Sequence, residues 1–98
     1  MKFIDLDAKE WVTPLDFYEA ILTSLGAPEW HGRSIAALID SMVVGDINAI
    51  EKPCRVVVNG LEEAGEDAFD ELIKAFAALA RYDNYAHITG NQAWLEIT

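Results

Sequence analysis

The most strand-like stretch of the chain is Pro53-Cys54-Arg55-Val56-Val57-Val58-Asn59-Gly60. It holds an uninterrupted run of three β-branched valines between a proline and a glycine, two residues that commonly mark the ends of strands. A run without polar alternation suits a strand covered on both faces, as the strands of parallel sheets are. We therefore expect a strand over residues 55–59 that is covered on both faces.

Helical patterns lie on both sides of this strand. Upstream, Thr13-Pro14-Leu15-Asp16 supplies a capping residue, a proline at the first helical position and an acid facing free N–H groups, and the helix is expected to end at Gly26. Ser34 caps a second expected helix that ends at Gly45. Its apolar side chains recur at helical spacing: Ile35, Leu38, Ile39, Met42 and Val43. Downstream, a third helix follows the acidic loop 62–67.

Short strand patterns occur at both ends of the chain, over Phe3–Leu6 and Ala93–Ile97. Whether His87-Ile88-Thr89 pairs with the last strand stays open at this point. The order is β-α-α-β-α-β, and helices between successive strands favour parallel pairing. We expect one α/β domain over residues 1–98, with a three-stranded parallel sheet packed with three to four helices.

The chain is strongly acidic, with seventeen Asp and Glu against seven Lys and Arg and a formal net charge of −10. Such a charge repels phosphate backbones, so it argues against nucleic-acid binding and favours a basic protein or a metal ion. No apolar run approaches the roughly 20 residues of a membrane span. The acids in Met1–Asp7 interrupt the apolar core that a signal peptide needs. We expect a cytoplasmic monomer that binds no membrane.

The sequence offers little chemistry for catalysis, a metal or a cofactor. The histidines are far apart, and no Cys-x-x-Cys or His-x-x-x-His spacing occurs. The lone Cys54 excludes an intramolecular disulfide and, at a strand entry, is expected to be a buried structural thiol. Glu29, His31 and Asp40 could converge as an acid–base cluster, but no oxyanion hole or substrate clamp accompanies them. We expect neither an enzyme, a metal site nor a cofactor.

The loop before the second helix is more informative. Trp30 falls outside any apolar periodicity, so it either fills the core from the loop or stands at a binding surface. His31 is expected to be an exposed loop residue. Asp40 falls roughly 130° from the centre of the apolar stripe by helical geometry and should face outward, flanked by Ala36 and Ala37. Aromatic anchors beside a charge are typical of interface hot spots, whereas the alternative is an ordinary solvated helix face.

Residues 28–40 resemble the signature stretch of the barstar family, which are intracellular inhibitors of barnase-type ribonucleases. Here the stretch is Pro28-Glu29-Trp30-His31-Gly32-Arg33-Ser34-Ile35-Ala36-Ala37-Leu38-Ile39-Asp40. In that family it runs Pro-Glu, two aromatics, Gly, a polar cap, then Ala-Leu, one residue, and Asp. The family's three-stranded parallel sheet with helices also agrees with the expected element order. The resemblance implies that the loop and second helix plug the active-site cleft of a basic ribonuclease.

The resemblance also implies roles for single residues. Asp40 matches the family's central acid, which occupies the phosphate position and pairs with catalytic Arg and His of the enzyme. Trp30 matches an aromatic residue that packs on the enzyme's active-site histidine. The implied partner is a basic extracellular-type or toxin ribonuclease, and the alternative is a different basic toxin or cellular protein. The partner-binding residues implied are Trp30, His31, Gly32, Ser34, Ala37 and Asp40.

Several positions depart from the family pattern. The second aromatic is His31, the cap is Ser34 instead of Asn, and an acidic family position is Ala36. The family's further acidic contact has no match in the stretch 77–80. Fewer anions suggest a different ribonuclease, weaker inhibition or another partner. A self-association surface made by the Trp30 loop and Met42-Val43-Val44 is a further alternative.

Overall fold

The computed structural model describes residues 1–44, 50, 52–82 and 84–98. In that part of the chain, four strands form one sheet in the order β1-β2-β4-β3. The strands are β1 (Lys2–Asp7), β2 (Cys54–Asn59), β3 (Tyr85–Ile88) and β4 (Gln92–Ile97). The helices are α1 (Pro14–Leu25), α2 (Ile35–Ile39) and α3 (Glu66–Ala80), with a π-helical turn over Asp40–Val44 and a 3₁₀ turn over Leu61–Glu63. The α/β class predicted from the sequence is confirmed.

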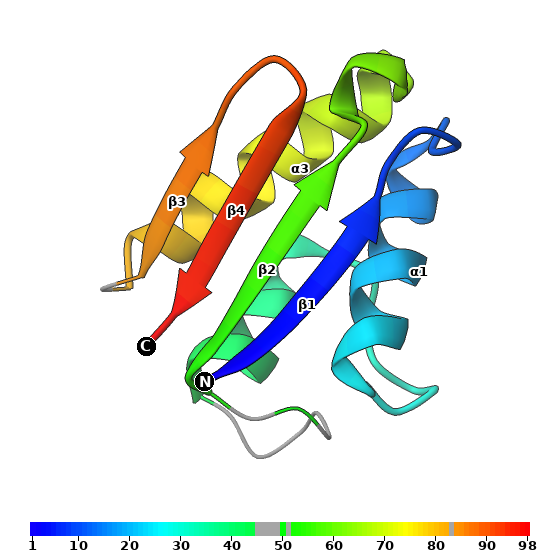
Figure 1. The fold of residues 1–98 in the computed structure, drawn as a ribbon. Coiled ribbons are helices and arrows are strands. Elements are labelled where there is room, and N and C mark those ends of the chain that lie inside the picture. The colour runs from blue at the N-terminus through cyan, green and yellow to red at the C-terminus, as the bar shows by residue number, and fades with distance from the viewer. Residues whose placement is uncertain (45–49, 51, 83) are drawn as a thin grey trace.

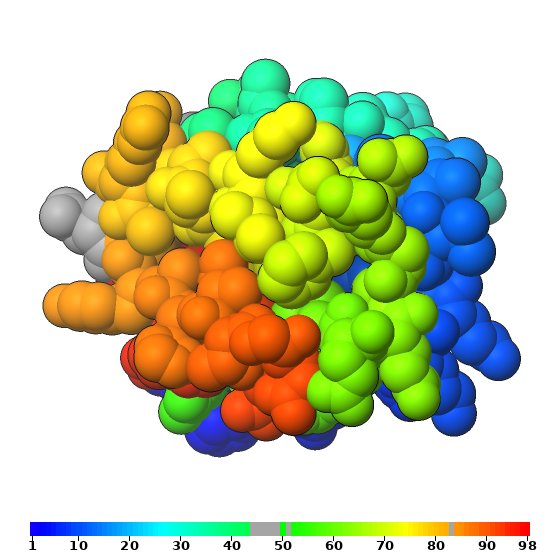
Figure 2. All heavy atoms as spheres, turned by 90° about the horizontal axis from the view of Figure 1, so that it is seen from above, coloured from blue at the N-terminus to red at the C-terminus, as the bar shows by residue number. Residues whose placement is uncertain are grey.

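The helices all lie on one face of the sheet and leave the other face open (Figure 1). Seen from above, the helical layer and the strand layer are separate, with α3 in yellow on one side and the β3–β4 hairpin in orange on the other (Figure 2). Along β2, Val56 and Val58 are buried, whereas Arg55 and Val57, which alternate with them, are only half-buried. The prediction that 55–59 is covered on both faces is therefore wrong. Val57 lies on the open face opposite its register partner Trp94. A cross-strand contact with an aromatic ring favours a β-branched side chain, which explains why position 57 is apolar although it is not fully buried.

The sheet is mixed, which corrects the expected all-parallel arrangement. β1 and β2 are parallel, as the intervening helices predicted, but β4 runs antiparallel to β2. After α3 the chain first forms the edge strand β3, then turns near Gly90 and returns as β4 between β3 and β2. β3 is thus parallel to β2, so the crossover through α3 obeys the parallel rule. The sequence predicted three strands and left the pairing of residues 87–89 open; the structure adds β3 as a fourth strand, and the β3–β4 hairpin places the last strand between β3 and β2.

The first helix begins and ends where the sequence predicted. The Asp16 carboxylate accepts hydrogen bonds from the backbone N–H groups of Thr13 at 3.0 Å and Val12 at 2.8 Å. These bonds lower the pKa of Asp16 below its ordinary value, because they favour the charged carboxylate. At the other end, Gly26 adopts φ 67°, a left-handed conformation that ends many helices.

The core lies between the helices and the inner face of the sheet. Phe17 of α1 packs edge-on against Phe76 of α3 at 6.4 Å between ring centroids, and Trp11 packs against Phe17 at 5.8 Å. The hydroxyl of Tyr18 donates a hydrogen bond to Glu71, which also joins α1 to α3. Burial and this carboxylate raise the pKa of Tyr18. These contacts fix the two long helices beside each other over the sheet.

The second helix is shorter and more irregular than its apolar pattern predicted. Ser34 caps it as expected, since its hydroxyl oxygen accepts a hydrogen bond from the Ala37 N–H at 3.1 Å. At Asp40 the helix changes into the π-helical turn, and the expected end at Gly45 lies outside the described residues. The alternative of a self-association surface made by the Trp30 loop and Met42-Val43-Val44 is wrong for Met42, because this residue is 4% exposed and belongs to the core. The side chain of Val44 is outside the described part of the chain.

Cys54 is buried at the start of β2, and burial raises the pKa of its thiol. This placement agrees with the expected structural thiol. Among the described residues, no helix combines the length and the apolar character that crossing a membrane requires.

Candidate partner-binding site

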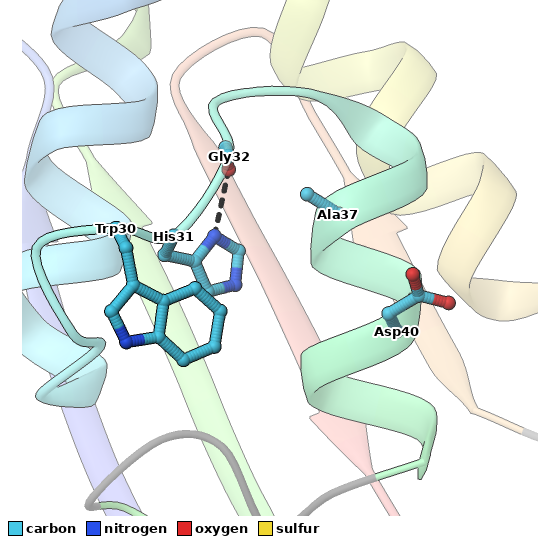
Figure 3. A pocket seen from close by; sticks show the side chains of 5 residues that line it. All are labelled: Trp30, His31, Gly32, Ala37 and Asp40. Carbon is cyan, nitrogen blue, oxygen red and sulfur yellow. Dashed lines mark hydrogen bonds between the residues drawn. The ribbon is translucent and has the colours of Figure 1, made fainter.

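A shallow, open hollow lies between the loop that precedes α2 and the α2 helix itself. Five of the six predicted binding residues line it: Trp30, His31, Gly32, Ala37 and Asp40. In Figure 3 the Trp30 ring stands on the loop side of the hollow and the Asp40 carboxylate on the helix side. Its volume is about 100 Å³, whereas pockets for small molecules usually measure roughly 300–1,000 Å³. The hollow suits one side chain of a protein partner better than a nucleotide or a cofactor.

Trp30 stands at the surface. Its side chain is 76% exposed and makes no hydrogen bond or ring contact with another described residue. Of the two interpretations left open by the sequence, filling of the core is thus wrong. A large apolar ring held in water gains free energy when a partner covers it.

Asp40 faces solvent, as the helical pattern predicted. Among the described residues, no cation lies within ion-pairing distance of its carboxylate. The nearest basic residue in the loop sequence, Arg33, is engaged elsewhere: its Nε lies 2.5 Å from Glu19 Oε1 of α1. This carboxylate raises the pKa of Arg33. The charge of Asp40 is therefore left available for a cation from outside.

His31 is buried, which corrects the expectation of an exposed loop histidine. Its side chain is 4% exposed and lies behind Trp30. Its Nδ1 lies 2.7 Å from the Gly32 carbonyl oxygen, and its Nε2 lies 2.8 Å from the Ser41 hydroxyl oxygen. The sequence prediction failed because it did not include a buried polar partner for the ring. Ser41, in the π-helical turn, supplies this partner through its hydroxyl.

Gly32 and Ser34 shape the site without offering functional groups to it. A Cβ atom added to Gly32 would lie 3.2 Å from the Cβ of Ala37, so the small residues at both positions let the loop approach α2 closely. Ser34 does not line the hollow, because its hydroxyl caps α2. The structure thus brings five predicted residues together and places the sixth beside them.

The acid–base cluster considered from the sequence does not assemble. Both ring nitrogens of His31 are engaged by Gly32 and Ser41, so neither is directed at Glu29 or Asp40. Glu29 does not line the hollow. In the described ranges, no group of three or more His, Cys, Asp or Glu side chains is arranged to hold a metal ion. The site presents a ring and a carboxylate to the outside, which is chemistry for recognition.

Comparison with protein families agrees with this arrangement. The model of the family described as "Barstar (barnase inhibitor)" matches residues 1–97, essentially the whole chain. The chain belongs to the barstar family. Comparisons with curated proteins and with solved structures find no match. Barstar proteins are inhibitors, not enzymes, and at the family level they bind barnase-type ribonucleases.

Two parts of this barstar site were missed by the sequence analysis. Ser41 is a buried polar residue, and its position inside the apolar stripe, between Leu38 and Met42, is the sequence signal that points to it. The ion pair between Arg33 and Glu19 joins residues fourteen positions apart, and no spacing rule connects a loop to a preceding helix. It engages the guanidinium of Arg33, the one basic side chain of the stretch 28–40 apart from the histidine, with a carboxylate of α1.

Proposed function

We propose that this chain inhibits a barnase-type ribonuclease by placing Asp40 and Trp30 in the enzyme's cationic active-site cleft. The observation that carries the proposal is the exposed Asp40 carboxylate without a cationic partner among the described residues, beside an exposed indole. Family membership supports the same kind of partner. The interface would comprise Trp30, Gly32, Ala37 and Asp40, with His31 and Ser34 supporting them from behind.

The carboxylate of Asp40 is a chemical substitute for a phosphate group of RNA. An arginine guanidinium donates two parallel hydrogen bonds to a carboxylate or to a phosphate in the same bidentate geometry, so a cleft built to hold the scissile phosphate also holds an aspartate. Trp30 can stack on an active-site imidazole, since aromatic rings gain free energy from offset stacking beyond their buried area. The hollow between them receives one enzyme side chain. Inhibition follows because the substrate position is then occupied.

The net charge of −10 supports fast association with a basic enzyme. Opposite net charges steer diffusional encounter and raise association rates at low ionic strength. The same charge makes this chain a poor ligand for nucleic acid. In this proposal the chain forms a single barstar-like domain, acts as a cytoplasmic monomer and protects cellular RNA.

The direct test is titration of a purified barnase-type ribonuclease with this chain while RNA cleavage is measured. The account expects activity to fall linearly to zero near one inhibitor per enzyme, and the association rate to fall as salt is added. Full activity at a large excess of a folded chain would contradict it. The Asp40→Asn variant serves as the matched chain, since it removes the charge and keeps the size of the side chain.

A second candidate is a basic toxin other than a ribonuclease. The observation that favours it is the exposed Ala36, four residues before Asp40, where the resemblance implies an acid. Asp40 then stands without a second carboxylate on that face of α2, which suits a partner with a smaller cationic site. Capture of basic proteins at low salt by wild type and by Asp40→Asn separates the candidates. A ribonuclease retained by wild type alone supports the first proposal, and a retained basic protein without ribonuclease activity supports the second.

A further inference from the structure

The His31 side chain connects the exposed loop to the helix that carries Asp40. Its Nδ1 lies 2.7 Å from the Gly32 carbonyl oxygen, which can only accept a hydrogen bond. Nδ1 therefore carries a proton. In the neutral ring, Nε2 is then the acceptor for the Ser41 hydroxyl at 2.8 Å, a shorter contact than the one of 3.3 Å between the same hydroxyl and the Leu38 carbonyl oxygen. The geometry thus specifies one neutral tautomer, with the proton on Nδ1.

The position of Ser41 gives this bond its importance. Ser41 follows Asp40 directly in the π-helical turn, and its bond to His31 joins residues ten positions apart. Both partners are buried, with exposed fractions of 4% for His31 and 3% for Ser41. A buried hydrogen bond is shielded from competing water, so losing it costs more than losing a bond at the surface. The bond consequently fixes the loop against the turn that carries Asp40.

Trp30 has no comparable fixation of its own. It is 76% exposed, and its indole makes no hydrogen bond or ring contact with another described residue. Its place relative to Asp40 therefore depends on the backbone of the loop, which the next residue, His31, anchors. Other contacts of the loop are the hydrogen bonds from the His31 N–H to the Pro28 carbonyl oxygen at 3.0 Å and from Arg33 Nη1 to the His31 carbonyl oxygen at 3.4 Å, both of which stay within the loop. Toward the helices it has the close approach of Gly32 to Ala37 and the exposed ion pair of Arg33 with Glu19. Exposed ion pairs contribute little to rigidity.

We propose that His31 is a positioning residue. Its buried hydrogen bond to Ser41 holds Trp30 and Asp40, before a partner arrives, in the relative arrangement that binding requires. The gain in affinity that this positioning would bring rests on the proposed function, because a loop that already has its bound conformation loses less conformational entropy on binding. The positioning itself concerns a contact within the free chain, so it can be tested without any partner.

The first experiment is NMR of the free chain labelled with ¹⁵N. When the His31 ring is neutral, its side-chain ¹⁵N shifts should show a protonated Nδ1 and an unprotonated Nε2 acceptor. Backbone order parameters at Trp30 and Gly32 should lie near the rigid value of about 0.85 and fall toward roughly 0.6 in Ser41→Ala. Ser24→Ala is the matched control, because it removes a part-buried serine hydroxyl whose hydrogen bond, to the Ile21 carbonyl oxygen, stays within α1. It should leave the loop unchanged.

The second experiment measures affinity for a barnase-type ribonuclease. If Ser41→Ala leaves the loop in its binding arrangement only about a tenth of the time, the apparent Kd rises roughly tenfold. The effect should nearly vanish in a Trp30→Ala background, because Ser41 acts through the placement of Trp30. A merely structural role would give the same loss in both backgrounds. His31→Phe keeps the ring and removes both hydrogen bonds, so it should reproduce Ser41→Ala.

The outcomes separate this inference from the proposed function. A proton on Nε2 of neutral His31, or loop order parameters unchanged in both Ser41→Ala and His31→Phe, overturns the positioning role whatever the partner. A rigid loop that loosens in the variants, in a chain that does not inhibit the ribonuclease, supports the positioning role and contradicts the proposed function.

Discussion

Two tryptophan–histidine pairs lie on different parts of the molecule, and their burial is reversed. In the loop pair, Trp30 is 76% exposed and His31 is 4% exposed. In the sheet pair, on the open face of the sheet, Trp94 is half-buried and His87 is exposed. The two rings of the sheet pair are stacked with 5.7 Å between their centroids.

The reversal shows which tryptophan is available to a partner. Trp94 is held by its own contacts, since the Arg55 guanidinium lies 4.5 Å from the ring centroid and His87 stacks beside it. Its indole therefore stabilises the sheet. Trp30 has no such contact, and the neighbouring histidine is buried beneath it. The same two residue types thus stabilise the fold in one region and present a binding surface in the other.

The largest difference is expected from matched substitutions of the two tryptophans. Trp30→Ala should weaken binding to a barnase-type ribonuclease by about thirtyfold or more, the usual effect of losing a hot-spot residue. It should leave the free energy of unfolding within about 0.5 kcal/mol, because the exposed ring is a surface position. Affinity is measured from binding kinetics on immobilised ribonuclease, and stability is measured by equilibrium unfolding in urea.

Trp94→Ala should do the reverse. Loss of a half-buried indole with its cation–π contact should lower the free energy of unfolding by about 1–3 kcal/mol. Affinity should change less than threefold, since Trp94 alternates along β4 with the buried Ala93 and Leu95 and therefore faces away from the helices. A comparison in which both variants lose affinity equally would remove the distinction between the two regions.

A smaller effect is expected from the bond that joins α1 to α3. Tyr18→Phe leaves the Glu71 carboxylate without its buried hydroxyl partner and should lower the free energy of unfolding by about 1–2 kcal/mol. Affinity should not change, because the bond lies outside the hollow. The urea midpoint and the ribonuclease titration of the same samples check both statements.

The same bond gives the stability a pH dependence in the alkaline range. Burial and Glu71 raise the pKa of Tyr18, so the native chain keeps a neutral phenol where the unfolded chain loses the proton. The contribution of Tyr18 is therefore complete below its ordinary pKa of 10.0 and is lost as the pH rises above that value. Wild type should lose stability more steeply above pH 10.0 than Tyr18→Phe does. Parallel curves for the two chains would contradict the assignment.

The smallest effect is expected at the exposed member of the sheet pair. His87→Ala removes one stacked ring from the surface and should cost about 0.5–1 kcal/mol of unfolding free energy. Affinity for the ribonuclease should stay the same. His31→Phe, by contrast, should lower affinity and loosen the loop, so the two histidines sharpen the comparison between the regions.

The parts of the fold that depend on local pattern could be predicted from the sequence. The cap at Thr13, the end at Gly26 and the outward face of Asp40 each follow from residues within a few positions of one another. The pairing of β4 with β2 could not be predicted, because it depends on a hairpin whose first strand, β3, is four residues long. A parallel crossover and a hairpin insertion use the same apolar residues in the last strand.

The candidate site divides in the same way. The exposure of Asp40 follows from helical geometry, whereas the exposure of Trp30 depends on how the loop is anchored. That anchor joins His31 to Ser41 across a π-helical turn, and such turns carry no clear sequence pattern. The family resemblance of residues 28–40 identified the loop and α2 as the candidate site. It included His31 among the binding residues because of its position in that stretch, and it did not predict that the ring is buried.

The most direct measurement of the central claim compares Asp40→Asn with Glu62→Gln in binding to a barnase-type ribonuclease. Both residues are exposed, and each substitution removes one negative charge and keeps the side-chain shape, so long-range steering changes equally. The account predicts that Asp40→Asn raises the dissociation constant by about thirtyfold or more, mainly through faster dissociation, while Glu62→Gln changes it less than threefold. Equal, small losses for the two variants would contradict the claim that Asp40 takes the place of the substrate phosphate.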